Sequence, residues 1–194
     1  MERLMYDSRV PDRDPDGKMF FPAPYDLGGV FDVAMIRERR GFIPLPDPNF
    51  DGRCIDIGGG NKILDGYDRL DWPEWSAGMP IPGDDGTVLG VFSAHALDHM
   101  TGEEVVSLLM EVDRVLAPGG TFTIVVPHYA SQLSAECIEH KSRFGIKTWR
   151  NILANPAYSP HFNRQHEWSL AVGFNMIMGV EERNTVLVTQ LVKI

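Results

Sequence analysis

The stretch 53–72 places the strongest constraint on what this chain can fold into. A short apolar run with one acid, R-C-I-D-I at 53–57, is followed by Gly58, Gly59 and Gly60. A second short run, at 67–70, leads into Asp71. Glycine permits a tight turn and close approach of the backbone to a ligand, and an acid at the tip of the next strand can accept both hydroxyls of a ribose. The stretch therefore predicts two strands around a nucleotide-like ligand.

The middle of the chain alternates predicted strands and helices. The link after Gly60 has room for one helical turn, at 61–64, but not for a full crossover helix. The apolar run T-V-L-G-V-F-S at 87–93 predicts a buried parallel strand, and 121–126 predicts another. Between them, T-G-E-E at 101–104 is a capping-box sequence, and the apolar residues that follow recur at helical spacing, so we expect a helix over 101–116.

Shorter elements are expected around this frame. Residues 79–81 could form a short edge strand, residues 94–100 a turn with a short helix, and residues 127–140 a loop or short helix. Helices are predicted at 147–153 and 163–171, and strands at 174–181 and 185–192. The four-residue turn between these two strands requires an antiparallel pair, because parallel strands need a long crossover.

The first fifty residues have a different character from the rest. Residues 1–50 are rich in proline, aspartate and glycine with interspersed aromatic residues, and 29–40 predicts one helix. The segment is too apolar to be a plain disordered tail. We expect either an N-terminal arm packed on the core or a lid over the site, and a core domain at 51–194.

Composition limits the classes of protein to consider. With 194 residues, 43% of them hydrophobic, one domain with a substantial core is the default. The chain shows no apolar run of about 18 residues, no secretory signal and only two cysteines, so we expect a cytoplasmic protein without membrane contact. A net charge of −9 disfavours nucleic acid as a partner without ruling it out, and a homodimer remains open.

Several motifs occur in one order: I-D-I-G-G-G-N, G-Y-D-R-L-D-W, P-I-P-G-D-D-G, S-A-H-A-L-D-H-M and E-V-D-R-V-L-A-P-G-G-T-F-T-I-V-V-P-H. This order resembles the class I S-adenosylmethionine-dependent methyltransferases, in particular small domains with a short link from motif I to motif II. The resemblance covers roughly 54–153. It implies a Rossmann-like α/β fold: a seven-stranded, mostly parallel sheet with an antiparallel last strand and helices on both faces, in a three-layer αβα sandwich.

The resemblance also implies S-adenosylmethionine as cofactor and a set of site residues. Motif I faces the methionine part, the acid at 71 holds the ribose, and the loop after the fourth strand lines the cofactor. Backbone amides of the glycine turn can meet the methionine carboxylate, and Trp72 could cover the adenine or simply pack. The expected cofactor-binding residues are Asp56, Gly58, Gly59, Gly60, Asn61, Asp71, Trp72, Ser93 and His95.

Catalytic candidates follow the strand at 121–126. A general base is needed only if the methyl acceptor starts protonated, and His128 and Tyr129 are the best-placed groups, although a structural role for His128 is equally open. His99 is expected to satisfy buried backbone groups. We assign no metal, because His140, His161 and His166 lack tight ligand spacing with cysteines or acids.

Two departures from the family pattern leave alternatives open. Lys62 stands where motif I usually has a third glycine, and Ser76, Ala77 and Gly78 stand where an acid commonly contacts the adenine. The leading hypothesis is methyl transfer to an unidentified acceptor. The alternative is a non-catalytic scaffold or cofactor-binding protein that retains the fold. A nicotinamide-dependent oxidoreductase is opposed by Ile63, where G-x-G-x-x-G requires glycine.

Overall fold

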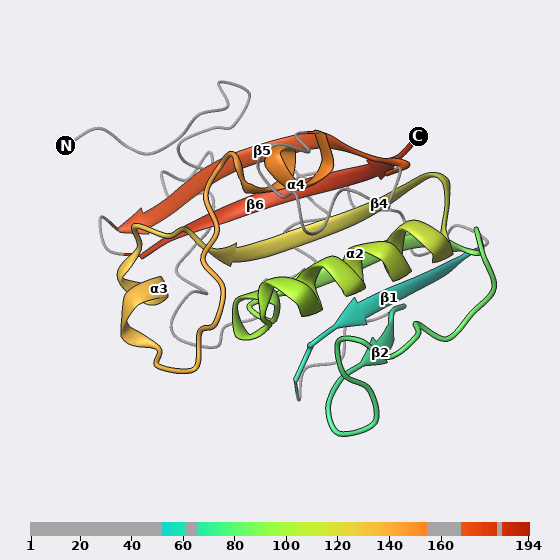
Figure 1. Cartoon of the computed structure of the whole chain (residues 1–194), viewed down its shortest axis with the longest axis horizontal. Helices are drawn as coiled ribbons and strands as arrows, with labels where there is room; N and C mark the ends of the chain where they lie inside the picture. The colour runs from blue at the N-terminus through green and yellow to red at the C-terminus, as the bar shows by residue number, and fades with distance from the viewer. Residues whose placement is uncertain (1–51, 61–65, 155–167, 182–183) are drawn as a thin grey trace, which may run out of the picture.

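A computed structural model describes residues 52–60, 66–154, 168–181 and 184–194. Within these ranges the chain forms six strands and four helical segments (Figure 1). In chain order they are β1 (Arg53–Ile57), β2 (Asp68–Leu70), β3 (Val88–Ala94), the 3₁₀ turn η1 (Leu97–His99), α2 (Gly102–Val115), β4 (Leu116–Pro127), α3 (Gln132–Glu136), α4 (Thr148–Ala154), β5 (Leu170–Glu181) and β6 (Asn184–Lys193). The helix expected at 29–40, the turn at 61–64 and the arm at 1–50 lie outside the described residues.

The described strands form one mixed sheet in the order β2-β1-β3-β4-β6-β5. β1 pairs in parallel with β2 and β3, and β3 pairs in parallel with β4. β6 lies between β4 and β5 and is antiparallel to both. The predicted antiparallel pair at the end of the chain and the antiparallel last strand are therefore confirmed.

The expected seventh strand is not found among the described residues. Its candidate, 79–81, lies in a loop of turns and bends from 71 to 87. Pro80 and Pro82 lack the N–H donors that a strand uses for its ladder. The amide of Ile81, between them, instead donates to a carboxylate oxygen of Glu111 at 2.9 Å. The segment is therefore a loop, as its prolines indicate, although its apolar residues suggest a strand.

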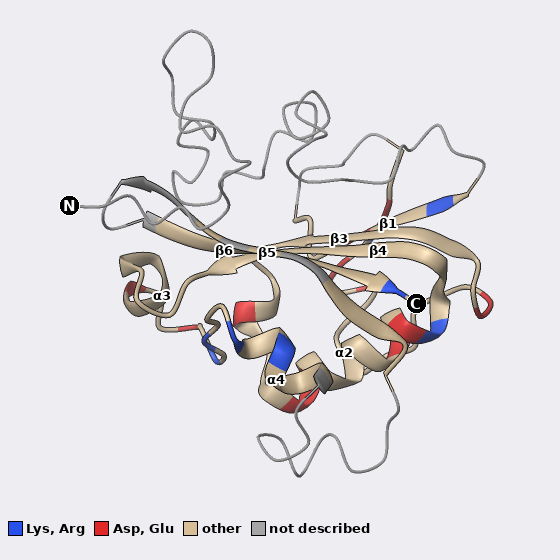
Figure 2. Cartoon of the chain, turned by 90° about the horizontal axis from the view of Figure 1, so that it is seen from above, with Lys and Arg blue, Asp and Glu red and all other residues tan. Residues whose placement is uncertain are grey.

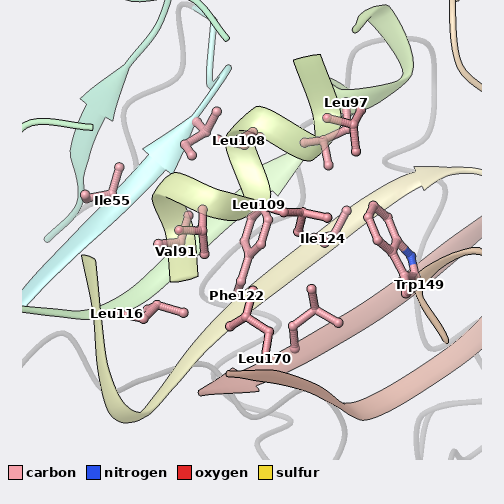
Figure 3. Packing of buried hydrophobic residues seen from close by; sticks show 14 of the residues in the cluster. Ile55, Val91, Leu97, Leu108, Leu109, Leu116, Phe122, Ile124, Trp149 and Leu170 are labelled. Atoms are coloured by element: carbon pink, nitrogen blue, oxygen red, sulfur yellow. The ribbon is translucent and has the colours of Figure 1, made fainter. Parts of the chain in front are cut away.

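Helix α2 forms where its sequence predicted it. The hydroxyl of Thr101 accepts from the amide of Glu104 at 3.2 Å, and the Glu104 carboxylate accepts from the amide of Thr101 at 2.6 Å, so the expected capping box is present. Its apolar stripe packs on the sheet, with Leu108 and Leu109 facing Val91, Phe122 and other buried residues (Figure 3). Burying side chains of this size contributes about 1.5–3 kcal/mol each.

Of the expected αβα layering, the described residues show the sheet and helices on one of its faces (Figure 2). α2 and α4 cover the same face of the sheet, and no described helix covers the opposite face (Figure 2). One physical reason is visible in the link from β2 to β3, where prolines interrupt the 71–87 loop.

The helix predicted at 163–171 is wrong over the part that the structure describes. Of the helix expected at 163–171, residues 163–167 lie outside the described residues, and β5 begins at Leu170. Leu170 pairs with Lys193, and Ala171 with Val192. The ladder continues with Val172, which pairs with Leu191, and Leu170 is buried against the core. Pairing with β6 therefore overrides the local helical pattern.

Candidate cofactor site

A cavity of ≈ 310 Å³ lies at the carboxyl ends of the parallel strands β2, β1 and β3. Its volume falls at the lower end of the range for small-molecule sites. In open α/β sheets, ligands bind in the crevice outside these strand ends. Its walls come from the end of β1, the loop after β2, the segment from β3 into α2 and one residue after α3. The lining residues are Ile57, Gly58, Leu70, Asp71, Trp72, Trp75, Ser76, Ala77, His95, Ala96, His99, Met100, Glu104 and Lys141.

The glycine turn after β1 has two distinct roles. Gly58 has a φ of +73°, its amide donates to the carbonyl of Leu70 at 2.9 Å, and an added Cβ would lie 2.3 Å from the Cβ of Ala96. Gly60 also has a positive φ, +60°, but an added Cβ would meet nothing within 4 Å. Gly58 is therefore required for packing, whereas at Gly60 only the left-handed backbone conformation favours glycine. Gly59 lies between them, and Asn61 lies outside the described residues.

Asp71 is held in place by the glycine turn itself. Its Oδ2 accepts from the amide of Gly60 at 2.6 Å, and its Oδ1 accepts from the amide of Trp72 at 2.8 Å. Arg69 lies 3.4 Å from the same Oδ2. The carboxylate is thus fixed at the cavity wall by two backbone donors while 19% of its side chain stays exposed. Oδ1 retains lone-pair capacity for a further donor, and at Oδ2 a ligand donor can replace the long contact of Arg69.

The loop after Asp71 forms one side of the cavity. Trp72 is 75% exposed and lines the cavity, whereas Trp75 is buried and its ring N–H donates to the carbonyl of Pro80 at 3.2 Å. Ser76 and Ala77, which stand where the family pattern has an adenine-binding acid, also line the cavity. This wall therefore offers aromatic surface and one hydroxyl rather than a carboxylate.

A single arginine anchors the same loop to α2. The guanidinium of Arg114 donates to the carbonyls of Ile81 and Gly83 at 2.9 and 3.0 Å, and to Asp85 at 2.9 Å. It also bonds Glu111 on its own helix at 2.8 Å. The planar five-donor group suits this arrangement, in which several acceptors are met at once. Helix α2 thus determines where the loop lies.

Asp56 is buried at the end of β1. Burial raises its pKa to about 7, with a smaller contribution from the negative charge of Asp71 and an opposing effect of Arg69. At the end of β3, His95 adopts a positive φ of 53° and lines the cavity. Burial also lowers the pKa of His95, which favours the neutral imidazole. Both predicted residues therefore lie at the strand ends that form the cavity.

Ser93 is also near the strand ends but faces inward. Its side chain is fully buried, and its hydroxyl donates to the carbonyl of Ile57 at 2.8 Å, joining β3 to the end of β1. It is not among the residues that line the cavity. The structure thus places Ser93 where it positions the glycine turn.

The two catalytic candidates follow β4, away from the cavity-lining set. His128 is 7% exposed, its amide donates to the carbonyl of Thr185 at 3.1 Å, and burial lowers its pKa. Tyr129 is 59% exposed, and its ring centroid lies 4.4 Å from that of His128. Neither residue lines the ≈ 310 Å³ cavity. They lie at the end of β4, the next strand of the sheet after β3.

Sequence reasoning missed several residues of this wall. His99, Glu104 and Lys141 line the cavity, and the Lys141 ammonium lies 4.0 Å from the Glu104 carboxylate. Lys141 comes from the segment after α3, which docks on η1 through amides of Lys141 and Ser142 that donate to the carbonyl of Asp98. Such tertiary docking carries no local sequence signal.

The histidines are also arranged differently from the sequence interpretation. His140 lies beside His99, with ring centroids 4.8 Å apart, and both lie near Cys137. His161 and His166 lie outside the described residues. The spacing Cys137-x-x-His140 is a sequence signal for this group, but its third member, His99, is distant along the chain.

Known proteins resemble this chain in fold but not detectably in sequence. No protein-family model and no curated protein matches the sequence. Solved structures do match. One is the methyltransferase in a complex with the Haloferax volcanii Trm112 methyltransferase activator, with a TM-score of 0.52 and 14% identity over 77% of this chain and 85% of that one.

Two further structures support the same fold. A SAM-dependent methyltransferase from Aquifex aeolicus has a TM-score of 0.51 and 14% identity, covering 90% of this chain and 94% of its own. Geranyl diphosphate C-methyltransferase from Streptomyces coelicolor, solved with Mg²⁺, geranyl diphosphate and S-adenosyl-L-homocysteine, has a TM-score of 0.51 and 11% identity, covering 84% and 80%. The protein thus has the fold of the class I methyltransferases, which the sequence motifs had predicted. Across the described ranges, no helix is long and apolar enough to cross a membrane.

Proposed function

We propose that this protein binds S-adenosylmethionine in the ≈ 310 Å³ cavity and transfers its methyl group to an acceptor not yet identified. The observation that carries the proposal is the carboxylate of Asp71, fixed by the amides of Gly60 and Trp72 at the tip of β2. An acid at this position of a βαβ-like unit is suited to two ribose hydroxyls. Fold alone would be insufficient support, since one fold serves many functions.

Other groups around Asp71 are suited to the remaining parts of the cofactor. Trp72 offers an exposed ring for the adenine face, and Ser76 offers a hydroxyl near the same wall. At the other end, the amides of Gly58 and Gly60 are already engaged by Leu70 and Asp71. Among the described residues, Gly59 is the one glycine of the turn whose amide is left for the methionine carboxylate.

The charges around the cavity also suit this ligand. Asp71 and Glu104 line the cavity, and Asp56 lies behind it at the end of β1. Carboxylates near the ligand favour the sulfonium and ammonium cations of S-adenosylmethionine. A bound cation would in turn lower the raised pKa of Asp56.

The protein's contribution to catalysis would be positioning. Bound S-adenosylmethionine would supply an activated methyl group, and the cavity walls would align it with the acceptor and exclude water. His128 and Tyr129 are proposed as the groups nearest the acceptor side at the end of β4. The lowered pKa of His128 keeps its imidazole neutral and able to accept a proton, should the acceptor need to lose one.

The domain boundaries belong to the same proposal. Residues 51–194 would form the methyltransferase-like domain, and residues 1–50 an arm packed on it or a lid over the cofactor. The two roles for the arm predict different results when it is removed: a lid should affect cofactor affinity and turnover, whereas a packed arm should affect stability.

The test separates cofactor binding from catalysis. Calorimetric titration of the full chain with S-adenosylhomocysteine and, separately, NAD should show micromolar binding of the first and none of the second. Isotope-labelled S-adenosylmethionine incubated with fractionated cell extract should then label an acceptor. Failure to bind either form of the methionine cofactor would overturn the proposal. Binding without transfer to any fraction would instead support the scaffold alternative.

A further inference from the structure

A cluster of potential metal ligands lies beside the cavity, where two distant parts of the chain meet. His99 is the last residue of η1, Cys137 follows α3, and His140 comes three residues later. One ligand atom from each of the three side chains lies within 4.8 Å of the others. Thiolate and imidazole are the ligands that Zn²⁺ prefers in proteins.

A second, independent observation concerns the polar atoms of this cluster. The His140 side chain is 8% exposed, yet its Nδ1 has no hydrogen-bond partner. Its Nε2 lies 2.8 Å from Oδ2 of the buried Asp98, in a contact that is close but not aligned as a hydrogen bond. Buried polar atoms without partners are costly, and each requires an explanation such as an ion.

The placement of Asp98 fits an established arrangement around metal-bound histidines. A ligating imidazole usually binds the metal through one nitrogen and donates its other N–H to a carboxylate or a carbonyl, which fixes the orientation of the ring. Here Nε2 of His140 faces Asp98 and Nδ1 is the atom left over. His99 Nε2 is farther from the same carboxylate oxygen, at 3.9 Å.

We propose that His99, Cys137 and His140 bind one Zn²⁺ ion, with Nδ1 of His140 as a ligand and Asp98 as the residue that orients this imidazole. Zn–N and Zn–S bonds of about 2.0–2.3 Å place tetrahedral ligand atoms roughly 3.5 Å apart. The observed separations of up to 4.8 Å therefore require the side chains to close by about 1 Å, which rotation of the partly exposed Cys137 and His99 allows.

The ion would connect the two segments that form this end of the cavity. The amides of Lys141 and Ser142 already donate to the Asp98 carbonyl at 2.8 and 3.1 Å, and the Ser142 hydroxyl donates to the carbonyl of Met100 at 2.6 Å. Since His99 and Lys141 both line the cavity, zinc would fix the wall that they form. With three protein ligands, the fourth position is left to water or another small ligand.

Cobalt binding tests the proposal without any assumption about methyl transfer. The full chain, made without a polyhistidine tag and freed of metal with a chelator, is titrated with Co²⁺. We expect one equivalent to produce a thiolate-to-cobalt charge-transfer band, and one equivalent of Zn²⁺ to abolish it. Elemental analysis of protein purified without chelator should show zinc near one atom per chain. Absence of binding at stoichiometric Co²⁺ and Zn²⁺ would overturn the proposal.

Matched variants assign the site to particular side chains. Cys137→Ser should remove the charge-transfer band and weaken Zn²⁺ binding by at least about 100-fold, whereas Cys54→Ala, at the other cysteine, should leave both unchanged. Asp98→Asn should weaken binding by about 10–100-fold while keeping the band. Circular dichroism checks that each variant is folded, and His99→Asn provides a second ligand test if Cys137→Ser is not. If folded Cys137→Ser binds Zn²⁺ as tightly as wild type, Cys137 is not a ligand and the proposed site is wrong.

Discussion

Replacement of Asp71 by alanine is the sharpest test of how the cofactor is held. In the structure its two carboxylate oxygens each accept one backbone amide, from Gly60 and Trp72. Oδ1 can accept one more donor, and at Oδ2 a second donor can replace the 3.4 Å contact of Arg69. In the proposed complex these further donors are the two ribose hydroxyls. Asp71→Ala removes both acceptors and leaves the fold of the sheet intact, because the residue lies after the last residue of β2.

The expected size of the effect follows from the number of bonds and their exposure. A hydrogen bond to a charged group contributes about 1.5–3 kcal/mol. Since 19% of the Asp71 side chain is exposed, the lower figure applies, and two bonds sum to about 3 kcal/mol. This corresponds to about a 100-fold loss of affinity for S-adenosylhomocysteine.

Asp71→Asn should fall between wild type and alanine. The amide keeps one acceptor oxygen, but its NH₂ group then faces one of the two backbone N–H donors that now bind the carboxylate. We expect about a 10-fold loss, equivalent to one bond. Calorimetric titration of wild type, Asp71→Asn and Asp71→Ala gives the three dissociation constants directly.

Glu74→Ala provides the matched control. It removes an exposed carboxylate from the same loop, at a residue that does not line the cavity. The affinity of Glu74→Ala for S-adenosylhomocysteine should stay within about twofold of wild type, because solvent screens an exposed charge outside the cavity. If Asp71→Ala binds as tightly as Glu74→Ala, while wild type binds in the micromolar range, the ribose is not held by Asp71 and the cofactor placement argued above is wrong.

Three further predictions test other parts of the structure. Gly58→Ala should lower the free energy of unfolding by about 2 kcal/mol or more, measured in urea, because the added Cβ is both in the left-handed region and 2.3 Å from that of Ala96; Gly60→Ala, with open space around it, should cost about 1 kcal/mol and chiefly weaken S-adenosylhomocysteine binding. Burial raises the pKa of Asp56 to about 7, so the folded state binds more protons than the unfolded state from about pH 4 to pH 7, and stability contributed by this group falls as pH rises through that window. The free energy of unfolding of wild type, measured in urea, should therefore decrease by about 2–4 kcal/mol across this window, and that of Asp56→Asn should not. Parallel pH profiles for the two proteins would contradict the raised pKa. Arg114→Lys should cost about 1–2 kcal/mol and also weaken cofactor binding, because one ammonium cannot reach all the acceptors of the loop; unchanged affinity would show that this anchor does not shape the site.

The sequence predicted the elements whose signals are local. The capping box and apolar stripe gave α2 to within one residue at each end, and the apolar runs gave β1 and β3. Asp71 was identified by its place after a short strand, and it does line the cavity. These features depend on residues close together in the chain, where periodicity and turn chemistry are informative.

Features that depend on distant contacts could not be predicted in this way. Ile81 has an apolar strand-like neighbourhood, but its amide is satisfied by Glu111, thirty residues further on. Leu170 was assigned to a helix because its pairing partner, Lys193, is not visible to a local pattern. The meeting of His99 with His140 likewise depends on how the segment after α3 docks on η1.

The position of β6 between β4 and β5 has a consequence for the order of folding. During synthesis β5 leaves the ribosome before β6, yet it pairs with the sheet only through β6 across the described residues. Until β6 follows, the edge of β4 is unpaired and the apolar side chains of β5 have no neighbouring strand. Such edges promote association between partly folded chains. Nascent chains of this protein should therefore depend on chaperones until β6 is inserted between its two partners.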